Sequence, residues 1–141
     1  MATITLFKTT VRNRLIAEST NAARTFVRND GVSDFESVVI DQQSYDSLAG
    51  AWHEAVARLT EKMHEFLSDT TIDGDSSVEF VFTADEQPDG LEDNLLMYVV
   101  DWMMGDWLSA VRPDHSKRYY DRAAMQMDDL LRKLYKKEAP V

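Results

Sequence analysis

The arrangement of apolar and polar residues predicts a helical chain centred on residues 91–111. At about 100° per residue, apolar side chains cover most of the circumference of Leu91–Val111, LEDNLLMYVVDWMMGDWLSAV. Only Asn94, Asp101, Gly105 and Arg112 form a narrow polar or small stripe, which we expect to reach solvent or a partner. A helix that is apolar on nearly all sides is covered by several neighbours, so this stretch predicts the central helix.

Within that helix we expect Val99, Trp102 and Met103 to be among the most buried residues. The run is long enough to cross a bilayer, but Asp101 and Asp106 in its middle would each cost several kcal/mol in lipid. We therefore interpret it as a core helix, with its methionines as core-filling side chains.

Two amphipathic stretches precede the central one. The first runs from about Thr9 to the capping sequence Asn29-Asp30-Gly31. The second, Gln42–Leu67, follows Asp41 as an N-cap and is apolar on one side only. Gly50 inside it predicts a close helix crossing.

Three short stretches are candidate strands. Val78–Phe82, VEFVF, is the strongest of them. Thr3–Phe7, TITLF, is either a short strand or the lead-in to a helix, and Val38–Ile40 can pair as a short strand.

The last helix begins at Asp114 or Ser116 and runs to about Lys137. Its predicted apolar stripe is Tyr120, Ala123, Ala124, Met127, Leu131 and Leu134. Pro113 ends the central helix, and the short turn makes the last two helices antiparallel neighbours. The prediction is a mainly α fold: one domain, residues 1–141, a four-helix bundle-like body around the central hydrophobic helix with a small β element.

Charge is unevenly distributed along the 141 residues. Residues 1–29 carry five basic residues against one acid, residues 30–111 two against nineteen, and residues 112–141 eight against five. This acidic body does not suit nucleic acid, whose phosphates need a basic surface. The chain has no cysteine, and its first residues lack the apolar run of a signal peptide, so we expect a cytoplasmic protein.

The charge blocks suggest how copies of the chain attract one another. Basic ends, including Lys136 and Lys137, can lie against the acidic loops of a neighbour, and a head-to-tail contact of this kind closes into a ring. The acidic partner surface would be Asp69, Asp73, Asp75, Asp85, Glu86 and Asp89. Alternatively, the basic ends fold back onto the acidic body of their own chain.

Candidate metal ligands are few. Glu61-x-x-His64 followed by Glu65 is half of a di-iron bundle motif, but neither His53 nor His115 completes a second half. Asp69, Asp73, Asp75 and Glu79 do not have EF-hand spacing, and Asp73-Gly74-Asp75 is better explained as a turn before a strand. We expect no metal and no cofactor.

Catalytic residues are not expected either. Asp101 and Asp106 are five residues apart and project about 140° from each other on a helix, so they cannot act as a pair. There is no glycine-rich phosphate loop and no Gly-x-Ser-x-Gly elbow.

Several stretches together resemble a family of small helical, prophage-encoded virion-assembly proteins. They are TITLFKTTVRNR, WHEAVARLTEKM, VEFVF, LLMYVVDWMMGDWL and YYDRAAMQMDDLLRKLY. The resemblance implies a head–tail connector or tail-completion subunit that binds protein partners, with no catalytic residues and no membrane or nucleic-acid binding. The alternative from the residues is a small intracellular regulatory module, immunity- or antitoxin-like, that uses an acidic surface.

Overall fold

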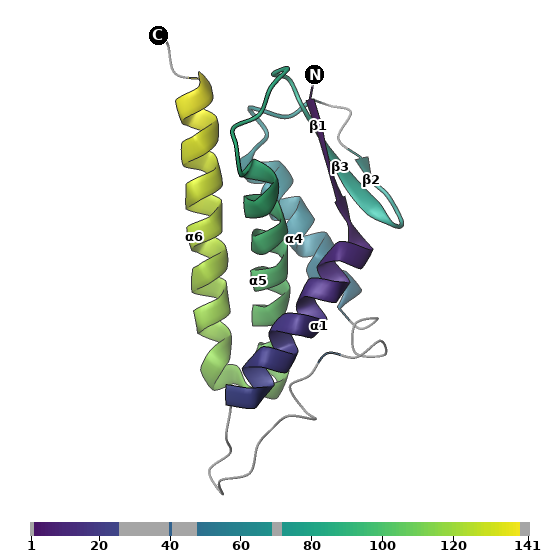
Figure 1. The fold of residues 1–141 in the computed structure, drawn as a ribbon, viewed down its shortest axis with the longest axis vertical. Helices are drawn as coiled ribbons and strands as arrows, with labels where there is room; N and C mark the ends of the chain where they lie inside the picture. The colour runs from purple at the N-terminus through teal and green to yellow at the C-terminus, as the bar shows by residue number, and fades with distance from the viewer. Residues whose placement is uncertain (1, 26–39, 41–47, 69–71, 139–141) are drawn as a thin grey trace, which may run out of the picture.

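The computed structural model describes residues 2–25, 40, 48–68 and 72–138 (Figure 1). Its elements in chain order are β1 (Ala2–Phe7), α1 (Lys8–Thr25), α4 (Ala49–Lys62), β2 (Ile72–Asp73), β3 (Ser77–Phe82), α5 (Leu91–Val111) and α6 (Pro113–Glu138). The fold is therefore mainly α with a small antiparallel sheet, as the residue pattern predicts.

The helix α5 is the centre of the described structure and has the bounds predicted from the sequence. It packs against α6, α4 and α1, and most of its apolar side chains from Leu91 to Leu108 are buried, whereas Leu96, Met97, Trp102 and Trp107 are partly exposed. Val99 and Met103 are completely buried, as expected. Trp102 is not: it is only partly buried against the core, whereas Trp52 of α4 is 1% exposed. The tryptophan at the centre of the core therefore comes from α4.

The helix α4 is shorter than the predicted Gln42–Leu67. The expected cap Asp41 and residues 42–47 lie outside the described residues, and a turn closed by the Phe66 N–H and the Met63 carbonyl oxygen (2.8 Å) follows the helix. The predicted apolar stripe is correct over most of its length, since Trp52, Ala55, Val56, Leu59 and Met63 are buried. The predicted close crossing at Gly50 is wrong, because Gly50 is exposed and a methyl group there would meet no atom within 4 Å.

The sheet has the order β1-β3-β2 and is antiparallel throughout. Thr3–Phe7 thus belongs to a strand, which passes directly into α1. Leu6 of β1 pairs with Val78 of β3, and both face the helices. Of the predicted strand Val38–Ile40 only Ile40 is described; it is buried, and its N–H donates to the Ser19 hydroxyl (2.9 Å).

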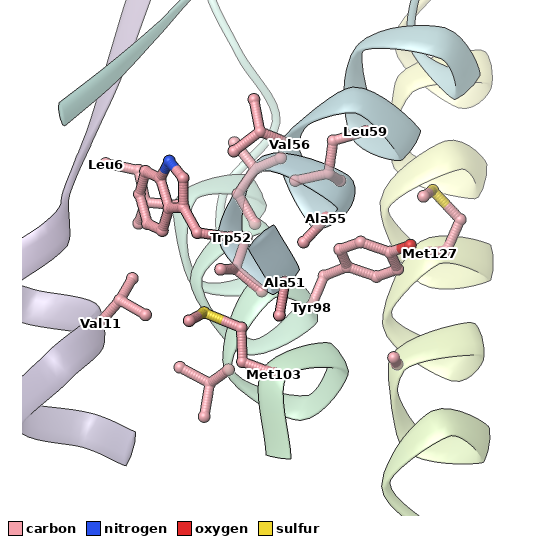
Figure 2. Packing of buried hydrophobic residues seen from close by; sticks show 14 of the residues in the cluster. Leu6, Val11, Ala51, Trp52, Ala55, Val56, Leu59, Tyr98, Met103 and Met127 are labelled. Atoms are coloured by element: carbon pink, nitrogen blue, oxygen red, sulfur yellow. The ribbon is translucent and has the colours of Figure 1, made fainter. Parts of the chain in front are cut away.

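Side chains from the sheet and all four described helices meet in one core. Figure 2 shows Leu6 of β1 and Val11 of α1 near Trp52 of α4, with Met103 of α5 beneath them and Met127 of α6 beyond Tyr98. No helix among the described residues is long and apolar enough to cross a membrane.

The helix α6 runs antiparallel to α5, as expected, and its C-terminal turns extend beyond the start of α5 (Figure 1). Its buried residues are Tyr119, Ala123, Met127, Leu130 and Leu134. The predicted stripe was therefore slightly rotated: Ala124 is exposed, and Tyr120 and Leu131 are only partly buried. The helix α5 makes polar as well as apolar contacts with α6. The position of the apolar residues of α6 therefore does not by itself define the side that faces α5.

Candidate functional site

Three residues of the polar stripe of α5, Asn94, Asp101 and Gly105, are buried and face α6, contrary to the prediction that the stripe reaches solvent, whereas Arg112 at the end of the helix is partly exposed. Asn94 is 6% exposed, and its side-chain amide donates to Gln126 (2.8 Å) and to Asp129 (2.9 Å). The Lys133 ammonium donates to the Asn94 amide oxygen at 2.6 Å. The Asn94 hydrogen bond is the main cause that lowers the pKa of Asp129. This network satisfies a buried amide, as a packed helix seam requires.

Two turns further along the seam, Asp101 is buried without hydrogen bonds. Its side chain is 1% exposed, neither carboxylate oxygen has a hydrogen-bond partner in the described structure, and the Arg122 Nε lies 3.9 Å away. Burial raises the pKa of Asp101 to about 6, although Arg122 opposes that shift. The prediction that Asp101 reaches solvent is wrong because its direction from α5 points to the junction with α1 and α6.

At the next position of the stripe, Gly105 allows the close approach of α5 and α6. A methyl group on Gly105 would lie 2.9 Å from a ring carbon of Tyr120. The same Tyr120 ring packs edge-on against Trp102 (4.9 Å between centroids), and the Arg58 guanidinium covers Trp102 at 4.3 Å. The contacts of Gly105 and Asn94 give this stripe a packing role in the helix interface.

Asp106 has other ionisable neighbours than Asp101, namely Glu54 of α4 and Tyr120 of α6. Burial raises its pKa, and the nearby carboxylate of Glu54 on α4 raises it further. The neighbours of Asp101 are instead Arg122 of α6 and the charged groups of α1. The two aspartates thus have different environments and form no acid–base pair.

The candidate metal ligands do not converge in the described residues. Glu61, His64 and Glu65 are exposed, and the His64 Nδ1 lies 2.8 Å from the Glu61 carbonyl oxygen. Within the described ranges, no group of three or more histidines and acids is placed to hold a metal ion. A hollow on the surface is lined by Met125, Gln126, Asp128, Asp129 and Arg132, all of α6.

The acidic loop forms the turn between β2 and β3. The Gly74 N–H donates to the Ser77 carbonyl oxygen (2.9 Å), which confirms a turn at this position. Asp69 and the side chain of Asp73 lie outside what is described, Asp75 is exposed, and Glu79 lies in the central strand.

The open edge of β1 is the feature best suited to bind another molecule. The Lys8 N–H donates to the Ser76 carbonyl oxygen (3.0 Å), which places the even-numbered residues of β1 in hydrogen-bonded pairs with β3. Because such pairs alternate along an antiparallel ladder, Thr3 and Thr5 direct both their N–H and C=O groups away from β3. The Phe7 N–H points the same way, whereas the Phe7 C=O accepts the first hydrogen bond of α1, which begins at Lys8. No described strand pairs with that side of β1.

The strand β1 itself carries none of the residues that usually protect an edge strand. The sequence ATITLF contains no charge and no proline, and the Phe7 ring is 52% exposed. Natural sheets usually place lysine, proline or a bulge at such an edge. The nearest lysine, Lys8, begins α1, and its ammonium lies 5.4 Å from the ring centroid of Trp52.

The sequence pattern identified the strand but missed its importance as an edge. The available signal was the uncharged run Ala2–Phe7 in a chain with 28% charged residues. Which side of a strand stays open depends on the sheet order, and β1 takes its place in the sheet by pairing with residues of β3 that are 70 to 80 positions away in the sequence. Comparisons with protein-family models, with curated proteins and with solved structures found no match, so the function must be inferred from the structure itself.

Proposed function

We propose that this protein is a non-enzymatic assembly protein that binds protein partners through the open edge of β1. The outward N–H groups of Thr3, Thr5 and Phe7 and the outward C=O groups of Thr3 and Thr5, with which no described strand pairs, carry this proposal. Strand addition at a sheet edge gives affinity through main-chain hydrogen bonds and specificity through alternate side chains. The edge lies on a rigid support, because Leu6 is buried in the core and β1 continues directly into α1.

We place the protein in the cytoplasm as a virion-assembly subunit of the head–tail connector or tail-completion type. The resemblance of its helical stretches to that prophage-encoded family supports this assignment. An assembly subunit needs a stable body and an exposed joining surface, and the helical core with its open sheet edge is suited to that role.

The charge blocks favour the edge over a purely electrostatic contact. Several basic groups pair within their own chain: Arg14 with Glu18 (3.5 Å), Arg122 with Asp101 (3.9 Å) and Lys133 with Asp129 (3.4 Å). Cations that pair within one copy offer less attraction to the acidic loops of another. A ring held together by attraction between the basic ends of one copy and the acidic loops of the next therefore has fewer unpaired cations for this contact than the sequence alone suggests.

The proposal requires that the gene lie among virion-assembly genes of a prophage-like element, and the test uses a strain that carries the gene in such an element. Particles are induced and purified from cells carrying the wild-type gene, a deletion, Phe7→Lys or Met125→Lys, and the chain is sought in them by mass spectrometry. Met125 is the matched control, since it is a 69% exposed apolar residue on α6, far from the sheet in sequence. We expect wild type and Met125→Lys in particles, and free heads and tails with the deletion and with Phe7→Lys. Complete infectious particles from the deletion strain would refute the proposal.

A second candidate function, the regulatory module, is favoured by the acidic loops. Asp75, Asp85, Glu86 and Asp89 are exposed around the sheet, and Glu92 and Asp93 are exposed in the first turn of α5. Such a surface suits a basic protein partner, bound the more weakly the higher the salt concentration. A partner of this kind would still bind the Phe7→Lys variant and would lose affinity when Asp85 and Glu86 are replaced by lysine.

A further inference from the structure

We propose that the partner of the β1 edge is a second copy of this chain, paired antiparallel through β1 about a two-fold axis at Thr5. This inference rests on the proposed function, because it names the occupant of the same edge. The pairing would join two three-stranded sheets into one continuous sheet, with the two β1 strands at its centre.

The backbone pattern of β1 is complementary to itself. Its outward-directed residues are Thr3, Thr5 and Phe7, spaced evenly about Thr5. With the axis at Thr5, Thr5 faces its own copy and Thr3 faces Phe7 of the other copy. Thr5 then exchanges both N–H···O bonds with its own copy, and each Thr3 C=O accepts the Phe7 N–H of the other copy, while the Phe7 C=O stays in the first turn of α1. A shift of the register by one pair loses part of this ladder.

Side chains on both faces of β1 are also compatible with this register. On the outer face the half-exposed Phe7 ring would cover the Thr3 methyl group of the other copy. On the inner face Ile4, which is only partly buried against the core, would lie beside Leu6 of the other copy. Cross-strand pairs of aromatic and β-branched residues stabilise antiparallel sheets.

Charge favours a second copy over a charged partner at this edge. No residue of Ala2–Phe7 is ionisable, so two copies bring no like charges together directly across the new pair. A partner attracted by charge would find nothing to recognise on the strand itself. Each copy carries a net charge of −10, so the copies repel at long range, and added salt should strengthen the pairing by screening that repulsion. Attraction between the basic ends of one copy and the acidic loops of another predicts the opposite, namely an association that weakens as salt is added.

The absence of cysteine from the sequence permits a direct test of the register. In the proposed pair the two Thr5 Cα atoms are about 5.5 Å apart, which a disulfide can span. The two Thr3 Cα atoms are four residues out of register, roughly 13 Å apart, and cannot be bridged. Mild oxidation of the full chain should therefore link Thr5→Cys to itself, leave Thr3→Cys monomeric, and link Thr3→Cys to Phe7→Cys in a mixture.

The oligomeric state is measured in parallel by sedimentation equilibrium at low and high salt. We expect a wild-type dimer that dissociates on dilution and strengthens in salt, an unchanged dimer for Met125→Lys, and at least tenfold weaker dimerisation for Phe7→Lys. Thr5→Pro is a second variant. The Thr5 N–H points away from β3, so proline removes a donor to the other copy and leaves the hydrogen bonds between β1 and β3 in place. Circular dichroism checks that each variant is folded.

Three results would overturn the inference. They are a wild-type chain that stays monomeric at several hundred micromolar, a dimer unaffected by both Phe7→Lys and Thr5→Pro, and self-linking of Thr3→Cys as efficient as that of Thr5→Cys. If the chain is monomeric but Phe7→Lys still abolishes particle assembly, the proposed function stands and the second-copy partner is wrong. If the dimer forms but particles assemble without the chain, the self-pairing stands and the assembly function is wrong.

Discussion

Replacing Asp101 by asparagine should stabilise the protein at neutral and alkaline pH. The carboxylate is 1% exposed and has no hydrogen-bond partner in the described structure, so its ionised form is poorly solvated in the folded state. Arg122 and Tyr119 of α6 and Arg14 and Glu18 of α1 are the ionisable groups that interact with it, and Arg122 alone does not offset the loss of water. Asparagine fills a similar volume without the charge.

The magnitude follows from the pKa of Asp101, which burial raises from 3.8 to about 6. Each pKa unit corresponds to about 1.4 kcal/mol, so a fully ionised Asp101 lowers the free energy of unfolding by up to about 3 kcal/mol. Because the folded pKa is the higher one, the folded state binds more protons between pH 4 and 6. Stability is therefore highest below about pH 4 for this group and falls as the pH rises through 6.

Urea unfolding followed by circular dichroism from pH 4 to 8 measures this effect. We expect Asp101→Asn to exceed wild type by about 1–3 kcal/mol at pH 8, with a difference that shrinks toward zero near pH 4. Asp128→Asn, which removes an exposed carboxylate of α6, is the matched control for net charge and should change little at either pH. If Asp101→Asn is less stable than wild type at pH 8, or if the difference does not vary with pH, the buried carboxylate does not destabilise the fold as argued.

Three further predictions concern the core and the rejected metal site. Gly105→Ala should cost about 1–3 kcal/mol by overpacking, since its methyl group meets the Tyr120 ring, and the double variant with Tyr120→Ala should recover part of that loss in urea unfolding. Trp52→Ala should cost about 3–5 kcal/mol and Trp102→Ala clearly less, because only Trp52 is fully buried; equal losses would contradict the burial difference. Purified protein should hold no stoichiometric zinc or iron that is lost in His64→Ala, as elemental analysis by mass spectrometry can determine.

Much of the local structure is determined by the sequence alone. The run Leu91–Val111 is continuous and apolar, and Pro113 limits it, so its helix has the predicted bounds. Alternation of apolar residues likewise predicts β3, and helical spacing predicts the buried face of α4. These features depend on neighbours within a few residues, which the sequence order supplies directly.

Only the tertiary structure determines which neighbouring element covers each face of a helix and each edge of a strand. The direction of Asn94 and Asp101 on their helix follows from its periodicity, but only packing shows that α6 covers that direction in place of water. For the same reason Trp52, not Trp102, became the central tryptophan. The open edge of β1 arises because β3 pairs with β1 on one side and with β2 on the other. Pairing between distant segments sets strand order and helix neighbours, and local periodicity contains no information about those partners.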